Sequence, residues 1–293
     1  MPVPLPEIRG AYQGPRPSAS VVILTLNERA NIDACLASCA WADDVHVLDS
    51  GSTDGTCERA LELGAKVWHN PFSSFGAQRN WAIDNIPTKH DWVFHLDADE
   101  RFTLPLVQEM DRAIRDGTPH AGFYLPNQMI LMGQWIKHCS GYPAYQVRFF
   151  HKDRLRFTDS GHGQREATTG TLGKLTTPYV HHNFSKGLAD WLERHNRYSS
   201  KEAAQIIEEL NRPLGVGTVL HGLLVGGMER RRTLKRVFAR LPMRSAIRFW
   251  FALTVQGGIL DGRAGLAYAR LLGIYEQMIA VKVREGRQGR PRD

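Results

Sequence analysis

Short apolar runs alternate with amphipathic segments through residues 20–101 of the chain. The runs are rich in β-branched and aliphatic residues, which is typical of strands that are buried on both faces of a parallel sheet. Strands that alternate with helices predict a doubly wound α/β fold, in which the carboxyl ends of the strands share one edge. The predicted strands are 20–27, 44–49, 65–69 and 92–96, and the predicted helices are 30–39, 55–63 and 74–86.

The pattern changes beyond residue 101. A helix over 104–115 is followed by short strand-like segments, by a loop over 159–166 that is rich in glycine and histidine, and by a long helix over 188–210. The strand-like segments are 122–125, 146–150 and 178–182. We expect a loose N-terminal tail over 1–18, an α/β domain over 19–205 and a helical, basic C-terminal region over 206–293.

Two acids one residue apart, Asp97 and Asp99, follow the predicted strand at 92–96. Ligands of open parallel sheets bind at this edge, so both carboxylates can face one cavity. Their oxygens suit hard divalent cations such as Mg²⁺ or Mn²⁺. The alternative is a polar turn that caps the helix over 104–115. The same edge collects polar residues from the other strand ends, namely Thr25, Asn27, Glu28, Asp49, Ser50 and Asp54.

Charge is unevenly distributed along the 293 residues, whose net charge is +7. From Asn211 onward there are 16 Lys/Arg and 5 Asp/Glu, a balance of +11, so the residues before it carry −4. Arginines repeat every four residues in this region, which places them on one half of a helix surface beside aromatic residues. This pattern predicts a helix at an anionic membrane surface, and the alternative is a solvated face packed on the α/β domain. The repeat consists of Arg232, Arg236, Arg240, Arg244 and Arg248.

The cysteine spacing and the apolar segments of the sequence indicate a cellular compartment. The four cysteines form no C-x-x-C pair and no zinc spacing, which indicates reduced thiols in a cytosolic setting. The N-terminus lacks the apolar core of a signal peptide, and the longest uncharged runs have 16 residues, too few for a membrane-spanning helix. We therefore expect a cytoplasmic protein that is peripheral to the inner membrane.

Four motifs stand in the first hundred or so residues: VVILTLNE at 21–28, VLDSGSTDGT at 47–56, GAQRN at 76–80 and HLDADER at 95–101. Together they resemble the family 2 glycosyltransferases, which have the GT-A fold. Their order and spacing match that family over about residues 20–101. The closer resemblance is to the soluble branch of lipopolysaccharide-core glucosyltransferases and exopolysaccharide sugar transferases. It implies a mostly parallel, Rossmann-like sheet with helices on both faces.

The resemblance implies an inverting, divalent-metal-dependent enzyme that moves a sugar from a UDP-linked donor to a lipid-carried saccharide. It gives each motif a role. Thr25, Asn27 and Glu28 would line the nucleoside pocket, and Asp49 would accept a hydrogen bond from the base. Ser50 and Asp54 would approach the ribose, Arg79 would hold the diphosphate, and Asp97 and Asp99 would hold ribose and metal.

An inverting transfer needs a carboxylate base for the acceptor hydroxyl. The candidates lie beyond Asp99 in the loop over 159–166, where Glu166 is favoured and Asp159 comes next. Some GT-A enzymes place a metal-binding histidine shortly after this point, so His181 and His182 are candidate ligands.

Other classes of α/β protein fit less well. A nucleotidyltransferase shares a similar layer, but it usually starts with a glycine-rich, arginine-bearing loop after the first strand, where this chain has TLNE at 25–28. A Rossmann oxidoreductase lacks its G-x-G-x-x-G here. A nucleic-acid-binding protein could use the basic C-terminal region, and it remains the third alternative. We expect no nucleic acid as a partner.

Overall fold

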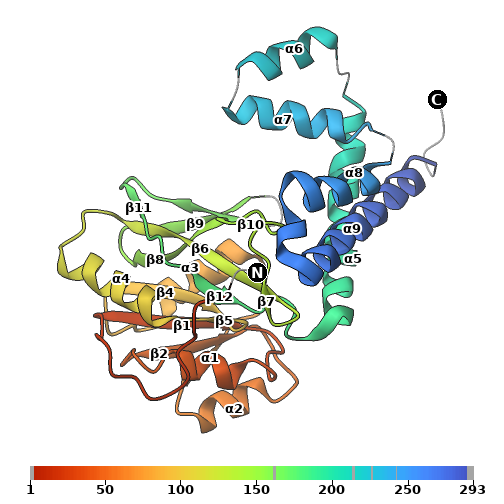
Figure 1. The fold of residues 1–293 in the computed structure, drawn as a ribbon. Helices are drawn as coiled ribbons and strands as arrows, with labels where there is room; N and C mark the ends of the chain where they lie inside the picture. Colours follow the sequence, from red (N-terminus) through yellow and green to blue (C-terminus); the bar gives the residue numbers. More distant parts are fainter. Residues whose placement is uncertain (1–2, 161–162, 213–214, 226, 242, 289–293) are drawn as a thin grey trace. The chain divides into compact units, whose positions relative to one another are not determined.

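The computed structural model describes residues 3–160, 163–212, 215–225, 227–241 and 243–288. The chain divides into two compact units, residues 1–186 and 187–293 (Figure 1). The sequence analysis placed the boundary after residue 205. The structure divides the chain before helix α5 (Gly187–Leu210), because α5 is continuous and packs along helix α9 (Gly262–Gln288) of the second unit.

A mixed sheet of ten strands forms the first unit, counted over the described residues. The central strand β1 (Ala19–Thr25) is parallel to β2 (Val45–Asp49) and to β4 (Trp92–Asp97), and β3 (Lys66–His69) extends the parallel part beyond β2. Beyond β4 the sheet becomes partly antiparallel. The strands beyond β4 in this sheet are β5 (Glu100–Arg101), β6 (Gly122–Leu131), β7 (Gln134–Trp135), β8 (Tyr145–His151), β11 (Leu172–Lys174) and β12 (Tyr179–His181).

Helices cover both faces of this sheet. Successive side chains of its buried strands point to opposite faces, so one strand supplies apolar side chains to a core on each face. In β1, Val21 and Ile23 pack in one core, whereas Val22 packs in another. The first core includes side chains of α1 (Ile32–Ser38), α2 (Thr56–Glu62) and α4 (Leu104–Arg115), and the second includes side chains of α3 (Phe75–Asn85). The α/β fold with helices on both faces is confirmed.

The segment expected as a loop over 159–166 instead contributes to a β-hairpin of β9 (Arg156–Ser160) and β10 (Gly163–Ala167), while residues 161–162 lie outside the described part. The first strand forms because it is bound to α3. The Asn80 side chain donates to the Phe157 carbonyl at 2.8 Å and accepts from the Phe157 N–H at 2.9 Å. The Phe157 ring is buried in the same core as α3.

The N-terminal segment lies along the first unit over residues 5–10, where a loose tail was expected. The Ile8 N–H donates to the Phe102 carbonyl at 3.0 Å, and the Ile8 side chain is buried. The Leu5 N–H donates to Gln128 Oε1 at 2.9 Å. Burial of one isoleucine and these bonds are enough to hold a proline-rich segment in place.

The second unit is helical. Its helices between α5 and α9 are α6 (Val216–Val225), α7 (Gly227–Phe238) and α8 (Arg244–Trp250), followed by a π-helical turn η1 (Phe251–Val255) and a 3₁₀ turn η2 (Gly258–Asp261). Within the described ranges, no helix combines the length and the apolar character that a membrane span requires.

The arginine repeat runs from α7 through a turn that contains Arg240 into α8, and its described side chains bind groups of the second unit itself. Arg244 pairs with Glu276 at 2.7 Å, and Arg236 pairs with Glu209. Arg240 and Arg248 donate to the Arg212 carbonyl and to the Gln256 side chain, respectively, while the Arg232 side chain lies outside the described part. The ion pairs therefore link α7 to α5 and α8 to α9 within the second unit, and a helix at an anionic membrane surface stays a prediction.

Candidate functional site

The parallel strands bring the predicted polar residues to one edge of the sheet. In the register of the sheet, Thr25 lies beside Asp49 and Leu24 lies beside Asp97. The carboxyl ends of β1, β2 and β4 are therefore neighbours, as right-handed crossovers require.

Asp49 organises the turn that follows β2. It accepts hydrogen bonds from Thr25 Oγ1 at 2.9 Å and from the Gly51 and Ser52 N–H groups at 2.8 Å each. Although burial alone would raise it, these bonds and the Ser52 hydroxyl hold the pKa of Asp49 below its usual value. Asp49 is thus an ionised carboxylate with an exposed fraction of 1%.

The loops after β1 and β2 are joined to each other. Asn27 has a positive φ of 54°, and its side chain accepts from the Thr53 N–H at 2.8 Å. Asp54 accepts from the Arg29 N–H at 3.0 Å, and Ser50 accepts from Gln78 Nε2 at 3.1 Å. These contacts fix the shape of a rim that is lined by backbone and short polar side chains.

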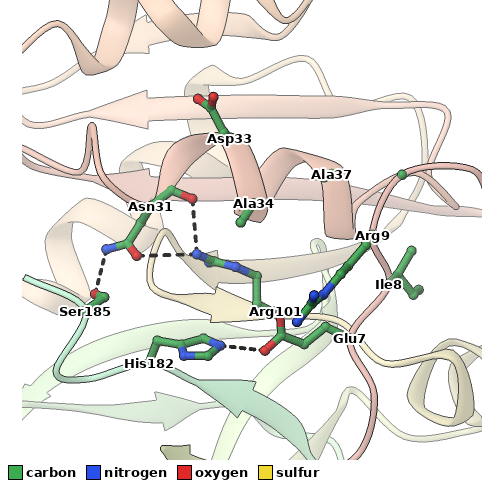
Figure 2. A pocket seen from close by; sticks show the side chains of 11 residues that line it. Glu7, Ile8, Arg9, Asn31, Asp33, Ala34, Ala37, Arg101, His182 and Ser185 are labelled. Atoms are coloured by element: carbon green, nitrogen blue, oxygen red, sulfur yellow. Dashed lines mark hydrogen bonds and ion pairs between the residues drawn. The ribbon is translucent and has the colours of Figure 1, made fainter. Parts of the chain in front are cut away.

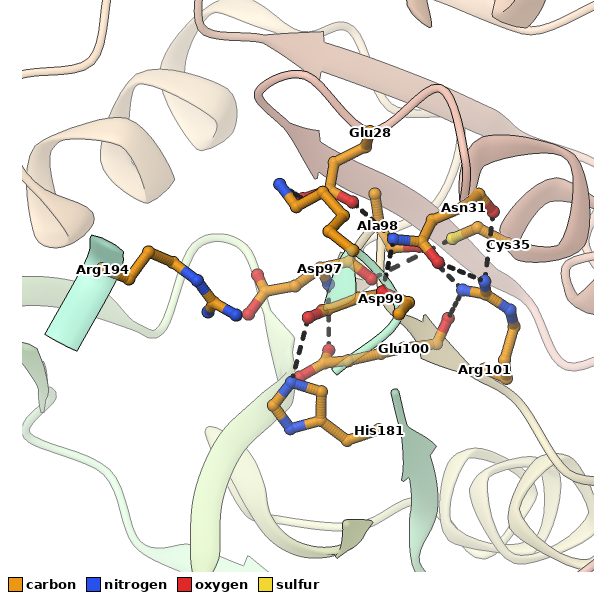
Figure 3. A network of polar contacts seen from close by, with 12 residues as sticks. Glu28, Asn31, Cys35, Asp97, Ala98, Asp99, Glu100, Arg101, His181 and Arg194 are labelled. Carbon is orange, nitrogen blue, oxygen red and sulfur yellow. Dashed lines mark hydrogen bonds and ion pairs between the residues drawn. The ribbon is translucent and has the colours of Figure 1, made fainter. Parts of the chain in front are cut away.

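Glu28, from the loop after β1, belongs to the polar network that includes Asn31 and Asp99 (Figure 3). It accepts from Asn31 Nδ2 at 2.6 Å and pairs with Lys186 at 2.7 Å. Burial is the largest cause that raises the pKa of Glu28, and the Asp99 carboxylate adds to it.

Two buried arginines hold Asp97. Arg79 Nη2 lies 3.0 Å from Asp97 Oδ1, and Arg148 Nη2 lies 2.6 Å from Asp97 Oδ2. Arg148 also binds Glu100 Oε1 at 2.6 Å. The sequence analysis missed Arg148 and Glu100. A signal for Arg148 was available, because it is the one charged residue in the predicted strand over 146–150.

Asp99 faces a histidine from a different strand. His181 Nε2, on β12, lies 3.2 Å from Asp99 Oδ2 (Figure 3). A carboxylate oxygen and an imidazole nitrogen at this spacing form a donor pair that fits a divalent cation such as Mn²⁺, and Mg²⁺ accepts the carboxylate. The ring of His182 instead pairs with Glu7 at 2.5 Å, so the two candidate histidines lie in different surroundings.

The His182–Glu7 pair lines a pocket of about 570 Å³ (Figure 2). Asn31 and Arg101 belong both to this pocket and to the polar network around Asp99. Arg101 is occupied by structural bonds, because it donates to the carbonyls of Ala98 and Glu100 at 2.7 Å each.

The two candidate bases differ in what they bind. Asp159 accepts from the Gly76 N–H at 3.0 Å and from the Ser74 hydroxyl at 2.7 Å, so both of its oxygens are bonded to the start of α3. Glu166 accepts from the Tyr124 hydroxyl, and this bond is the largest cause that raises the pKa of Tyr124 to about 12.

Asp49, Cys57 and His69 form a second group that could hold a cation, since their ligand atoms lie within 4.8 Å of one another. However, burial and the neighbouring Asp49 raise the pKa of Cys57 to about 12, so the thiol keeps its proton at neutral pH. Thiolate, not thiol, is the metal ligand, which makes this group the weaker candidate.

Residues 20–162 match the family model of glycosyl transferase family 2. This part of the chain is a family 2 glycosyltransferase domain, and the chain is a glycosyltransferase. A lipopolysaccharide core biosynthesis glycosyltransferase, LpsC of Rhizobium meliloti, is 24% identical over 213 residues, which cover 68% of this chain and 75% of that protein. The resemblance to the lipopolysaccharide-core branch is thereby confirmed.

Other similarities cover a smaller part of the chain or have a lower sequence identity. An uncharacterized glycosyltransferase of Rickettsia bellii is 39% identical over 93 residues, about a third of either chain. The structure of Staphylococcus aureus TarS (residues 1–349) aligns over 94% of this chain and 93% of that one, with 15% identity and a TM-score of 0.41. Glucosyl-3-phosphoglycerate synthase of Mycobacterium tuberculosis, in complex with Mn²⁺ and UDP-glucose, aligns over 44% of this chain and 52% of that one, with 23% identity and a TM-score of 0.33.

Proposed function

We propose that this enzyme transfers a glycosyl group, with inversion, from a UDP-linked sugar to a lipid-carried saccharide of a cell-envelope or exported polysaccharide. It would work on the cytoplasmic side of a membrane, as a peripheral protein. The family, the lipopolysaccharide core biosynthesis role of the Rhizobium relative and the polar edge of the sheet support this proposal. The observation that carries it is the pair of Asp99 and His181 beside the arginine-bound Asp97.

Asp99 and His181 would hold the divalent cation, Mg²⁺ or Mn²⁺, with Asp97 next to them. A bound divalent cation would stabilise the negative charge that develops on the leaving nucleoside diphosphate. His182 is the weaker candidate, since its ring is paired with Glu7.

Arg79 would contact the diphosphate. It is 2% exposed, and its Nη1 atom has no hydrogen-bond partner among the described residues. A buried donor without a partner is costly, so an anionic ligand at this position would stabilise it. Its other nitrogens already bind Asp97 and Gln164, which fixes the direction of the guanidinium.

The nucleoside would lie on the rim formed by the loops after β1 and β2. Asp49 would accept from the base, and its ionised state agrees with that role. Thr25, Asn27 and Glu28 would line the pocket, while Ser50 and Asp54 would approach the ribose.

Glu166 would remove the proton of the acceptor hydroxyl. Both oxygens of Asp159 are bonded to α3, which suits an anchor for the β9–β10 hairpin better than a base. The Tyr124 hydroxyl bonds one oxygen of Glu166 and would orient the carboxylate.

Calorimetric titration with UDP and a panel of nucleotide sugars, with and without Mn²⁺, tests the metal and the donor. We expect Asp99→Ala and His181→Ala to lose the Mn²⁺-dependent part of binding. His182→Ala is the matched control and should keep it, because its ring binds elsewhere. Equal behaviour of the two histidine variants would contradict the assignment of the cation to Asp99 and His181.

Transfer kinetics test the base. Glu166→Gln should keep donor binding and lower the transfer rate by about 10²-fold or more. Asp159→Asn, which keeps the size of the side chain, should affect thermal stability more than the chemical step. Near-normal turnover by Glu166→Gln would give the role of base to another group.

A further inference from the structure

The second unit contains a helical hairpin with an apolar tip. Its first arm is α8 followed by η1, its second arm is η2 followed by α9, and α8 packs along α9 (Figure 1). The chain reverses at Gln256 and Gly257, and Gly257 has a positive φ of 76°.

Close backbone packing makes this hairpin a defined structure. A Cβ atom on Gly265 would lie 2.0 Å from the Gly258 carbonyl oxygen, so η2 packs directly against the first turn of α9 at the tip. Further along, a Cβ on Gly273 would lie 3.3 Å from the Ser245 carbonyl oxygen. The outward direction of the side chains at the tip is therefore fixed by the fold.

The side chains on the outside of this hairpin are large and apolar. At the tip, Val255 is 72% exposed, Ile259 is 67% exposed and Leu260 is 60% exposed. Ile247, Trp250 and Phe251 are also exposed, and they follow one another at helical spacing toward the tip. Single exposed apolar residues are normal, but six within 14 residues are typical of a surface that contacts a protein or a membrane.

Charge identifies the kind of partner. Residues 241–275 contain four arginines, no lysine and a single acid, Asp261, which is 1% exposed. Arg244 and Arg248 bind Glu276 and Gln256, but Arg263 and Arg270 are exposed, and their spacing of seven residues places them on one side of α9. The apolar tip is thus accompanied by exposed positive charge and by no exposed negative charge.

We propose that the hairpin tip, defined as residues 247–260, inserts into the surface of a bilayer that contains anionic lipids. The inference rests on the membrane association proposed above, and it names the element responsible for it. A convex apolar tip needs no complementary cavity when it enters a lipid phase, whereas a protein partner would have to supply one. Tryptophan at the boundary and arginines beside it suit the interface between lipid tails and headgroups.

Flotation with vesicles of phosphatidylcholine, with and without phosphatidylglycerol, tests the proposal on the full chain. We expect salt-sensitive binding to the anionic vesicles. The double variant Ile259→Asp/Leu260→Asp should bind them about 10-fold more weakly or worse. The matched control is Val281→Asp on α9. Val281 is also well exposed, at 53%, but lies far along the helix from the tip, and the variant should bind like the wild type. Arg263→Gln/Arg270→Gln should lose the preference for anionic lipid.

Several outcomes would overturn the proposal. Wild-type binding by the double variant would do so, and so would an absence of vesicle binding by the wild type. If the wild type is a dimer by light scattering and the double variant is a monomer, the tip binds a second copy of the chain instead. The readout is independent of glycosyl transfer, because Asp99→Ala should float like the wild type. Tip-dependent flotation without donor binding would therefore refute the transfer proposal alone.

Discussion

Replacing Arg148 with methionine would remove the cation that joins Asp97 to the buried Glu100. Arg148 is 4% exposed and binds Asp97 and Glu100 at 2.6 Å each. Arg79 would still pair with Asp97, but Glu100 is fully buried, and no other ion pair to it is described. Burial and the Asp97 carboxylate already raise the pKa of Glu100, so the variant would take up a proton there.

Removal of one partner from a buried ion pair costs roughly 3–5 kcal/mol, because the remaining acid must either stay charged without its partner or take up a proton. Methionine keeps most of the side-chain volume of arginine, so little of this loss comes from a cavity. For a unit of this size, the melting temperature should fall by roughly 10 °C. Binding of a nucleotide should weaken as well, since Asp97 loses one of the two groups that orient it.

A matched control separates the effect of burial on the strength of an ion pair from the effect of its length. Arg115 pairs with Asp111 at 2.6 Å too, but its side chain is 68% exposed. Arg115→Met should therefore cost less than about 1 kcal/mol in urea denaturation, as exposed ion pairs usually do. The double variant Glu100→Gln/Arg148→Met should recover roughly 1–3 kcal/mol of the loss, because it leaves no charge at residue 100. Equal costs of the two arginine variants, or strictly additive costs in the double variant, would refute the reasoning.

Two further predictions concern the frame of the first unit. Burial alone would raise the pKa of Asp44, but hydrogen bonds from the Lys89 N–H, Ser20 and Lys66 hold it below its usual value. The stability that these bonds provide is present above the ordinary aspartate pKa. It is lost as the pH falls through the lower native pKa. Asp44→Asn should lower the free energy of unfolding by roughly 1–3 kcal/mol at neutral pH. Between neutral and acid pH, the urea midpoint of the variant should fall less than that of the wild type. An equal fall of the two midpoints would contradict this reasoning. At Gly76 a Cβ would lie 2.8 Å from Asp159 Oδ1, so Gly76→Ala should cost roughly 1–3 kcal/mol and slow transfer by shifting the β9–β10 hairpin, as thermal melting and turnover would show.

Local patterns were sufficient for the parallel half of the fold. Strands buried on both faces appear as continuous apolar runs, and each expected strand in residues 20–97 overlaps an observed one. The helix expected over 104–115 has these bounds in the structure, because Thr103 caps it and Pro105 suits its first turn. The family motifs then pointed to the edge that collects the polar residues.

Contacts between distant segments could not be read from the sequence. Arg148 lies 51 residues from Asp97, and only the antiparallel pairing of β8 with β4 brings the two side chains together. The period of the arginine repeat predicted that these side chains share one face of a helix, but not what that face contacts. The acids that pair with Arg236 and Arg244 are Glu209 and Glu276, which come from other helices. The glycines around residue 161 suggested a loop, whereas Asn80 supplies the bonds that make the preceding segment a strand.

Two acids separated by one residue have different electrostatic surroundings, and this difference argues for a division of roles. Asp97 is neutralised by two guanidinium groups within 3.0 Å, so a divalent cation bound there would be repelled by both of them. Asp99 has an imidazole from β12 as its neighbour, and a neutral imidazole is a ligand and not a competitor for a cation. Asp97 would then keep Arg79 aimed at the diphosphate, and Asp99 would hold the metal. We therefore propose that the aspartate pair provides one ion-pair anchor and one metal ligand instead of two equivalent ligands.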